Sequence, residues 1–166
     1  MTDVMVYSKD HQPNAAANVI EPLHWHSNSA ALSDLIAGDR LWVVTSGKSL
    51  NHEQERAGFL VAVWVVERVI ENPGDDPAFS HRNYGYRIIG DETESIELDE
   101  PVNVDHVIRS DRFDDTVSVG RFLRGPRRLN DQRVRLMRAA AGSQMAQKWL
   151  TGTTKDTVTT AEENKR

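Results

Sequence analysis

The chain has 166 residues, a formal net charge of −5 at pH 7, ordinary apolar content and no cysteine. This length suits one domain with a tail, and the absence of cysteine excludes disulfides, thiolate zinc sites and a cysteine nucleophile. The acidic charge counts against non-specific DNA binding, because generic nucleic-acid binders are usually basic.

The N-terminal residues give no sign of export. Met1 to Asp10 contains acidic residues and no long apolar run, unlike a secretory signal. The longest apolar run, Gly58 to Val66, is too short to cross a bilayer as a helix. We therefore expect a cytoplasmic protein with no membrane partner.

The first half of the chain predicts strands around one helix. Val4 to Tyr7 favours a short strand, and residues 10–21 favour a loop. Asn28 or Ser29 is a suitable N-cap for a helix over residues 30–37, which Gly38 would end. A β-rich run over residues 41–45 follows directly, and a polar loop over residues 49–56 comes after it.

Ala57 to Ile70 carries the strongest strand signal in the chain. β-branched residues dominate it, and it is apolar at nearly every position up to Val66. A strand without polar alternation is covered on both faces. We therefore expect this segment to lie at the centre of a sheet.

The second half predicts short strands and a closing helix. The strands are expected at residues 84–89, 95–98, 104–108 and 117–119, with an irregular insertion at 77–83. An apolar stripe predicts a helix over residues 130–150, and its members are Val134, Met137, Ala141, Met145 and Trp149. The polar, threonine-rich residues 151–166 should form a disordered tail.

These elements do not alternate as βαβ units. Several short strands with one early and one late helix favour a mixed sheet curled into a barrel. The predicted fold is therefore an α/β (α+β) mixed β-barrel with flanking helices, formed by residues 1–150.

A first candidate site is the segment His24-Trp25-His26-Ser27-Asn28. A tryptophan offers a flat face on which a base can stack, and serine and asparagine can bond to base edges or phosphate. The alternative interpretation is structural, with Trp25 as a core anchor and Asn28 as a helix cap. His24 and His26 share one face of an extended chain, but no third ligand is fixed near them, so we expect no metal.

A second candidate site is the end of the strand that contains Trp42. Ser46 and Gly47 are small and would let a ligand approach the backbone. The alternative is an ordinary turn after a strand.

A third candidate lies late in the chain, where charge is segregated. Between Arg121 and Arg138 there are seven arginines but only one acid, Asp131. Arg121, Arg124, Arg127 and Arg128 surround Gly125-Pro126, and arginine forks match phosphate oxygens well. The alternative is a solvated surface or pairing with the chain's own acids.

In order along the chain, these pieces resemble the EVE and YTH domains of the PUA-like superfamily. The matching pieces are Val4 to Tyr7, Trp25-His26-Ser27-Asn28, Gly38-Asp39 through Ser46-Gly47, Ala57-Gly58 through Val66, and Phe122-Leu123-Arg124-Gly125-Pro126. The resemblance extends over about residues 4–140. It implies a module that holds a modified base of DNA or RNA in an aromatic cage, with Trp25 on one wall and Trp64 or Tyr84 on the other.

The expected function is therefore binding of a modified nucleobase, without a cofactor. The expected ligand contacts are Trp25, His26, Ser27, Asn28, Trp42, Ser46, Gly47, Trp64 and Tyr84. The expected nucleic-acid backbone contacts are Lys48, Arg121, Arg124, Arg127 and Arg128. Two alternatives remain at this point: a small nucleotide or RNA hydrolase using His24, His26 or Glu53, and a protein-interaction domain.

Overall fold

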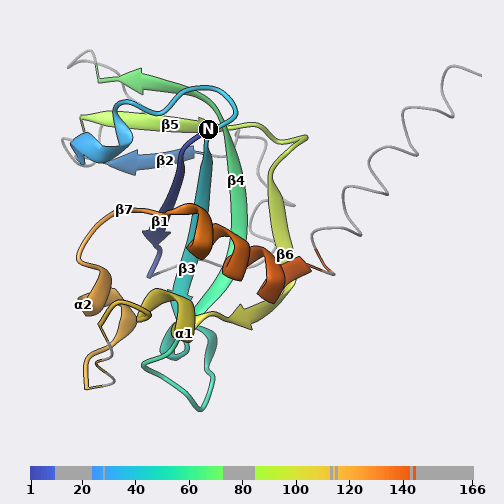
Figure 1. Ribbon diagram of the computed structural model, residues 1–166. Helices are drawn as coiled ribbons and strands as arrows, with labels where there is room; N and C mark the ends of the chain where they lie inside the picture. Colours follow the sequence, from blue (N-terminus) through green and yellow to red (C-terminus); the bar gives the residue numbers. More distant parts are fainter. Residues whose placement is uncertain are drawn as a thin grey trace, which may run out of the picture.

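The computed structural model describes residues 1–9, 24–27, 29–72, 85–112, 114, 116–142 and 144. These residues form a mixed α+β fold around one sheet of seven strands (Figure 1). The strands are β1 (Asp3–Tyr7), β2 (His24–Ser27), β3 (Arg40–Ser46), β4 (Gly58–Glu71), β5 (Tyr86–Gly90), β6 (Ile96–Asn103) and β7 (Arg127–Arg128). The predicted fold class is thus confirmed at the level of α+β.

The sheet is mostly antiparallel. The strand order is β2-β5-β4-β3-β1-β7, with β6 also paired to β4. Only β1 and β3 run parallel, with Met5 beside Trp42, whereas β7 returns antiparallel to β1. No pairing between described strands joins β2 to β7. The described strands therefore form an open sheet, and the expected barrel is not confirmed.

Strand β4 organises the sheet, as its β-branched sequence predicts. It has 14 residues and pairs with β3, β5 and β6. Its register shifts between Leu60 and Ala62 against β6, and again between Val66 and Arg68 against β5. Such bulges bend a strand and increase its twist, which lets one strand serve different neighbours along its length.

The two faces of the sheet carry two apolar cores. Along β3, Trp42 belongs to one core cluster and its neighbours Leu41 and Val43 to the other. Along β1, Met5 joins Trp42 while Val4 joins the opposite cluster. This alternation follows from the two-residue period of a strand. Both faces are covered, in agreement with the unbroken apolar sequence of β4.

Helices cover the Trp42 face. These are α1 (Asp105–Ile108), α2 (Val119–Leu123) and the helix over residues 131–142, which crosses in front of β3 and β4 in Figure 1. Met137 and Ala141 of this last helix are buried in the Trp42 core, so this part of the predicted closing helix is confirmed. The opposite core is completed by Leu32 and Leu35, in and just after the short 3₁₀ helix η2 (Ala30–Leu32).

Three predicted elements are wrong or too long. The helix expected over residues 30–37 is only the 3₁₀ turn η2, because the Ser33 hydroxyl donates to the Ala30 carbonyl and the Ile36 amide donates to the Asp39 carboxylate. The strand expected at residues 104–108 is instead the helix α1 over 105–108, and the strand expected at 117–119 is absent, since Val119 begins α2.

Several predicted features lie outside the described residues. They are the loop at 10–21, the insertion at 77–83, Asn28, Tyr84 and the tail at 151–166. Over the described part of the chain, no helix has the length and apolar content needed to span a membrane.

The end of β3 is closed by its own loop. This loop includes the 3₁₀ helix η3 (Lys48–Leu50). The Gly47 amide donates to the Ala57 carbonyl at 3.0 Å, and the Gly47 carbonyl accepts from the His52 amide at 2.8 Å. A Cβ atom on Gly47 would lie 2.0 Å from the Gln54 carbonyl oxygen. The space beside Gly47 is therefore filled by the protein's own backbone.

We predict that Gly47→Ala lowers the free energy of unfolding by roughly 1–3 kcal/mol, because the new methyl group meets backbone that cannot move away alone. Gly142→Ala is the matched control, since a Cβ there meets nothing within 4 Å. That helical substitution should raise stability by about 0.5–1 kcal/mol. Urea unfolding of both variants measures the difference, and equal stabilities would contradict the close approach at Gly47.

Candidate functional site

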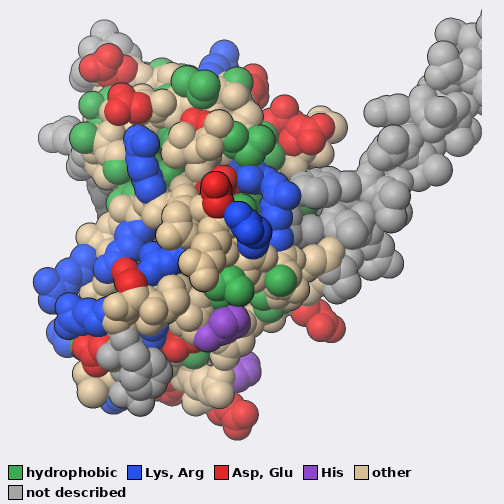
Figure 2. Space-filling view, in the orientation of Figure 1, with side chains coloured by type: hydrophobic (Ala, Val, Ile, Leu, Met, Phe, Trp, Pro, Cys, Tyr) green, Lys and Arg blue, Asp and Glu red, His purple; other side chains and the backbone are tan. Residues whose placement is uncertain are grey.

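A basic hollow of about 590 Å³ lies beside α2, near β7. Its lining residues come from the segment after α1, from α2 and its end, and from β7: Asp111, Arg112, Asp114, Val117, Arg121, Phe122, Arg124 and Arg127. Figure 2 shows Lys and Arg side chains gathered on the side of the molecule where Figure 1 places α2. This basic hollow contains three of the arginines that the sequence singles out.

The turn after α2 places Arg124 at the hollow. Arg124 has φ 47° and ψ 18°, in the left-handed region, and its amide donates to the Gly120 carbonyl. Gly125 follows with φ 142°. Two consecutive positive φ angles end the helix and redirect the chain into β7. A glycine usually occupies the position that Arg124 holds, because a side chain is strained there.

Arg127 is held in place by α2. Its Nη2 atom donates to the Phe122 carbonyl at 2.9 Å, which satisfies a carbonyl of the last helical turn. Its guanidinium also lies over the Phe122 ring, 4.9 Å from the centroid. Arg127 is therefore ordered before any ligand arrives.

Two aspartates in the hollow are satisfied by other groups. The Asp111 carboxylate pairs with Arg133 at 2.9 Å, and this hydrogen bond lowers the pKa of Asp111. The Asp114 carboxylate accepts from the hydroxyl and the amide of Thr116, which lower its pKa, and lies 3.7 Å from Arg112. Both carboxylates stay ionised at neutral pH.

The remaining cations are free to bind a ligand. Among the described residues, no carboxylate lies within ion-pair distance of Arg121, Arg124 or Arg127. Arg121 and Arg124 are exposed, and Arg127 is half-buried. Guanidinium forks bind phosphate and carboxylate oxygens with paired hydrogen bonds. With four arginines and two aspartates in its lining, the hollow has an excess of positive charge that can attract an anion.

A fifth arginine, Arg109, supports the hollow from inside the protein. It is 3% exposed, and its guanidinium lies 5.0 Å from the Phe122 ring centroid. It donates to the Asp105 carboxylate at 2.9 Å, to the Arg56 carbonyl at 3.0 Å and to the Asp114 carbonyl. These bonds join α1 to two loops, and one of those loops lines the basic hollow.

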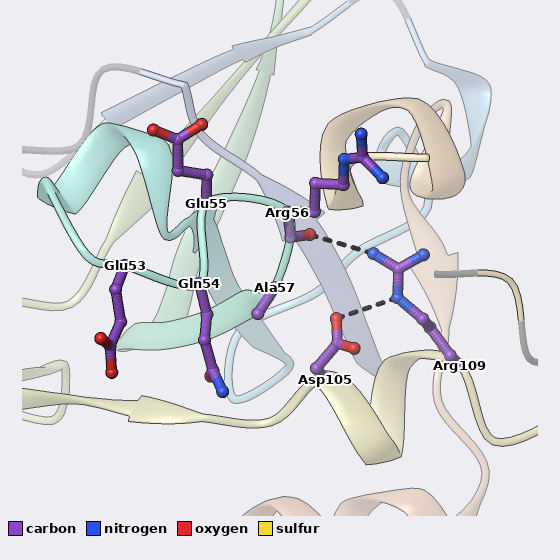
Figure 3. A pocket seen from close by; sticks show the side chains of 7 residues that line it. All are labelled: Glu53, Gln54, Glu55, Arg56, Ala57, Asp105 and Arg109. Carbon is purple, nitrogen blue, oxygen red and sulfur yellow. Dashed lines mark hydrogen bonds and ion pairs between the residues drawn. The ribbon is translucent and has the colours of Figure 1, made fainter. Parts of the chain in front are cut away.

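Arg109 also borders a second hollow, of about 510 Å³, shown in Figure 3. This second hollow contains Glu53 and Glu55, whose side chains point away from each other in Figure 3. Asp105 points toward Arg109 there and also accepts from the Gly58 amide at 3.0 Å. Within the described chain, no group of three histidines or acids is placed to hold a metal ion. Among the described residues that line this hollow there is no histidine to act as a base beside Glu53.

The Trp25 segment forms the strand β2. Trp25 lies opposite Ile88 in the β2–β5 ladder and is half-buried. Its ring meets the Trp64 ring edge-on, with centroids 6.0 Å apart at 77°. Trp64 is 9% exposed and its indole N–H donates to Glu97 at 3.2 Å. Trp25 is thus the member of the pair that presents surface to solvent.

Four other expected ligand contacts have structural roles. Trp42 is fully buried, and its indole N–H donates to Asp3 at 2.8 Å, so its ring offers no face to a ligand. Ser46 is buried and its hydroxyl bonds to the Ser49 hydroxyl, and Gly47 is enclosed as described above. The Ser27 hydroxyl accepts from the Ser29 amide at 2.9 Å.

The structure does not join the expected sites into one pocket. Trp25 packs on the core that contains Leu41 and Val43, whereas Phe122 of the basic hollow packs on the Trp42 core, on the other face of the sheet. Lys48 lies on η3 and Arg128 on β7, and neither lines the basic hollow. The side chains of His24 and His26, together with Asn28 and Tyr84, lie outside the described residues.

Sequence reasoning misses Arg109, Arg112 and Phe122. Asp105 and Arg109 are four residues apart, the spacing of an ion pair on a helix. The sequence contains that signal, but the β-branched Val107 and Ile108 between them favour a strand. A scan of the chain against protein-family models and a search of the curated proteins both find no match.

We predict that Arg109→Leu lowers the free energy of unfolding by roughly 3–5 kcal/mol, because it leaves Asp105 and two carbonyls without their buried donor. Arg112→Leu is the control: its side chain is 78% exposed, and the expected change is within about 0.5 kcal/mol. Chemical denaturation compares the two. A similar small effect for both would show that Arg109 does not hold these segments together.

Proposed function

We propose that the chain is a cytoplasmic, PUA-like nucleic-acid-binding module that holds phosphate in the basic hollow. The observation that carries this proposal is that one cavity is lined by three arginines, Arg121, Arg124 and Arg127. Among the described residues, no carboxylate forms an ion pair with any of them. Counterion release by arginines at phosphates supplies affinity. The net charge of −5 is compatible with this function, because a local field acts over about 8–10 Å at physiological salt.

A second contact in this proposal is a modified base at Trp25. This contact is supported by the position of Trp25, which is half-buried and keeps part of its surface exposed to solvent. Its ring packs edge-to-face against the Trp64 ring. An indole face stacks on any base, and methyl groups on the base add dispersion contacts. Because Trp25 and the basic hollow lie on different faces, the two contacts make separate contributions to binding.

We predict that Arg124→Gly and Arg121→Gln each weaken binding of a single-stranded oligonucleotide by roughly 10-fold or more, the worth of a charge-assisted hydrogen bond. The slope of log K against log salt should become shallower by about 0.7 for each phosphate that the variant no longer binds. Arg68→Gln, an exposed arginine of β4 outside the hollow, is the charge-matched control. Fluorescence anisotropy at several salt concentrations measures both quantities, and an equal loss of affinity in all three variants would refute the site.

We predict that Trp25→Ala removes the preference for oligonucleotides with a modified base. The affinity for such an oligonucleotide should fall by about 5- to 150-fold, which is the worth of stacking one base. Trp25→Phe keeps an aromatic face and should retain most of the preference. The salt slope should not change in either variant, since both keep every arginine that binds phosphate. If Trp25→Ala is folded by thermal melting and keeps its preference, base recognition at Trp25 is wrong.

A further inference from the structure

The basic hollow has the shape and charge for the end of a phosphate chain. Its cations arrive from three segments: Arg112 after α1, Arg121 and Arg124 at α2, and Arg127 on β7. They therefore surround a cavity instead of following a line. A cavity of about 590 Å³ falls within the range of small-ligand sites, which is roughly 300–1,000 Å³.

Charge matching favours a phosphomonoester over a phosphodiester. A phosphomonoester carries about −1.5 to −2 charges at pH 7 and presents three acceptor oxygens. An internal phosphodiester has one charge and two free oxygens, and its ester oxygens continue into sugars on both sides. Three guanidinium groups line this one cavity, none of them in an ion pair with a carboxylate of the described residues, and they match the first ligand better.

The site is also built in advance. Arg127 is fixed by the Phe122 carbonyl and ring, and the Phe122 ring is contacted in turn by buried Arg109. The Asp111 carboxylate is occupied by Arg133, whose Nε atom donates to Ser110 at 3.1 Å. Asp111 therefore holds its ion pair with Arg133, and its carboxylate also attracts the Arg127 guanidinium without forming an ion pair with it.

We propose that the basic hollow is a receptor for a terminal phosphomonoester, either the 5′-phosphate end of a nucleic-acid strand or a free nucleoside monophosphate. This inference rests on the proposed function, because it specifies which phosphate the hollow holds. The monoester dianion lies against Arg121, Arg124 and Arg127. The strand, where there is one, leaves the hollow in a single direction.

The test compares one short single-stranded oligonucleotide with a 5′-phosphate and the same oligonucleotide with a 5′-hydroxyl, using the full chain. The 5′-phosphate should tighten binding by about 10-fold or more. Arg124→Gly should abolish this difference without loss of thermal stability, because glycine adopts the left-handed conformation at φ 47° without strain. Arg68→Gln should preserve the difference.

The possible outcomes separate the two proposals. If the 5′-phosphate adds nothing while Arg124→Gly still weakens the 5′-hydroxyl oligonucleotide, the module binds nucleic acid and the terminal-phosphate inference is overturned. If the 5′-phosphate adds affinity that Arg124→Gly leaves intact, the inference is also overturned, since the monoester lies elsewhere. A third outcome is that neither oligonucleotide binds, whereas adenosine or uridine 5′-monophosphate binds and Arg124→Gly abolishes that binding. In that case the basic hollow is a phosphomonoester receptor and the proposed nucleic-acid binding is wrong.

Discussion

The buried guanidinium of Arg109 is the interaction on which the candidate site depends. It donates to the carboxylate of Asp105 on α1 and to the backbone carbonyls of Arg56 and Asp114. A buried arginine is costly unless all its donors are used. Here each bond goes to a different segment, so satisfying one side chain fixes three pieces of chain in relation to each other. The same residue links the fold to the arginines of the basic hollow, because the guanidinium groups of Arg109 and Arg127 both lie over the Phe122 ring, which is buried in the Trp42 core. Because Arg127 is attached in this way, less side-chain entropy is lost when a ligand binds to it.

Strong local signals make much of the fold predictable, and the errors fall where signals compete. The β-branched run of β4 identifies the central strand without any tertiary information. Residues 104–108 favour a strand in the sequence because three of the five are β-branched, and so short a segment does not separate strand from helix. In the structure Val104, Val107 and Ile108 are buried, a helical spacing that the sequence does contain. The barrel predicted from the order of the elements is not confirmed, because closure of a sheet depends on pairings between distant segments that the sequence does not specify.

The candidate site is predictable in composition but not in arrangement. The sequence places an arginine-rich segment around Gly125, and three of its members line one hollow. The prediction for Trp42 is wrong because an aromatic residue in a strand has the same sequence signature whether it faces a ligand or Asp3. Face assignment follows from register, and a one-residue shift exchanges every side chain between the two faces.

The backbone at Arg124 gives an argument that does not depend on charge. An arginine at φ 47° bears a strain that glycine would avoid, and the chain has a glycine at the very next position. Strained residues persist where the surrounding structure requires them, and they concentrate at binding sites. Here the strain is not needed to end the helix, since glycine would do so as well. By keeping arginine at this position, the chain keeps a guanidinium at the edge of a cavity that Arg121 and Arg127 also line. A guanidinium is the group that the proposed phosphate site requires.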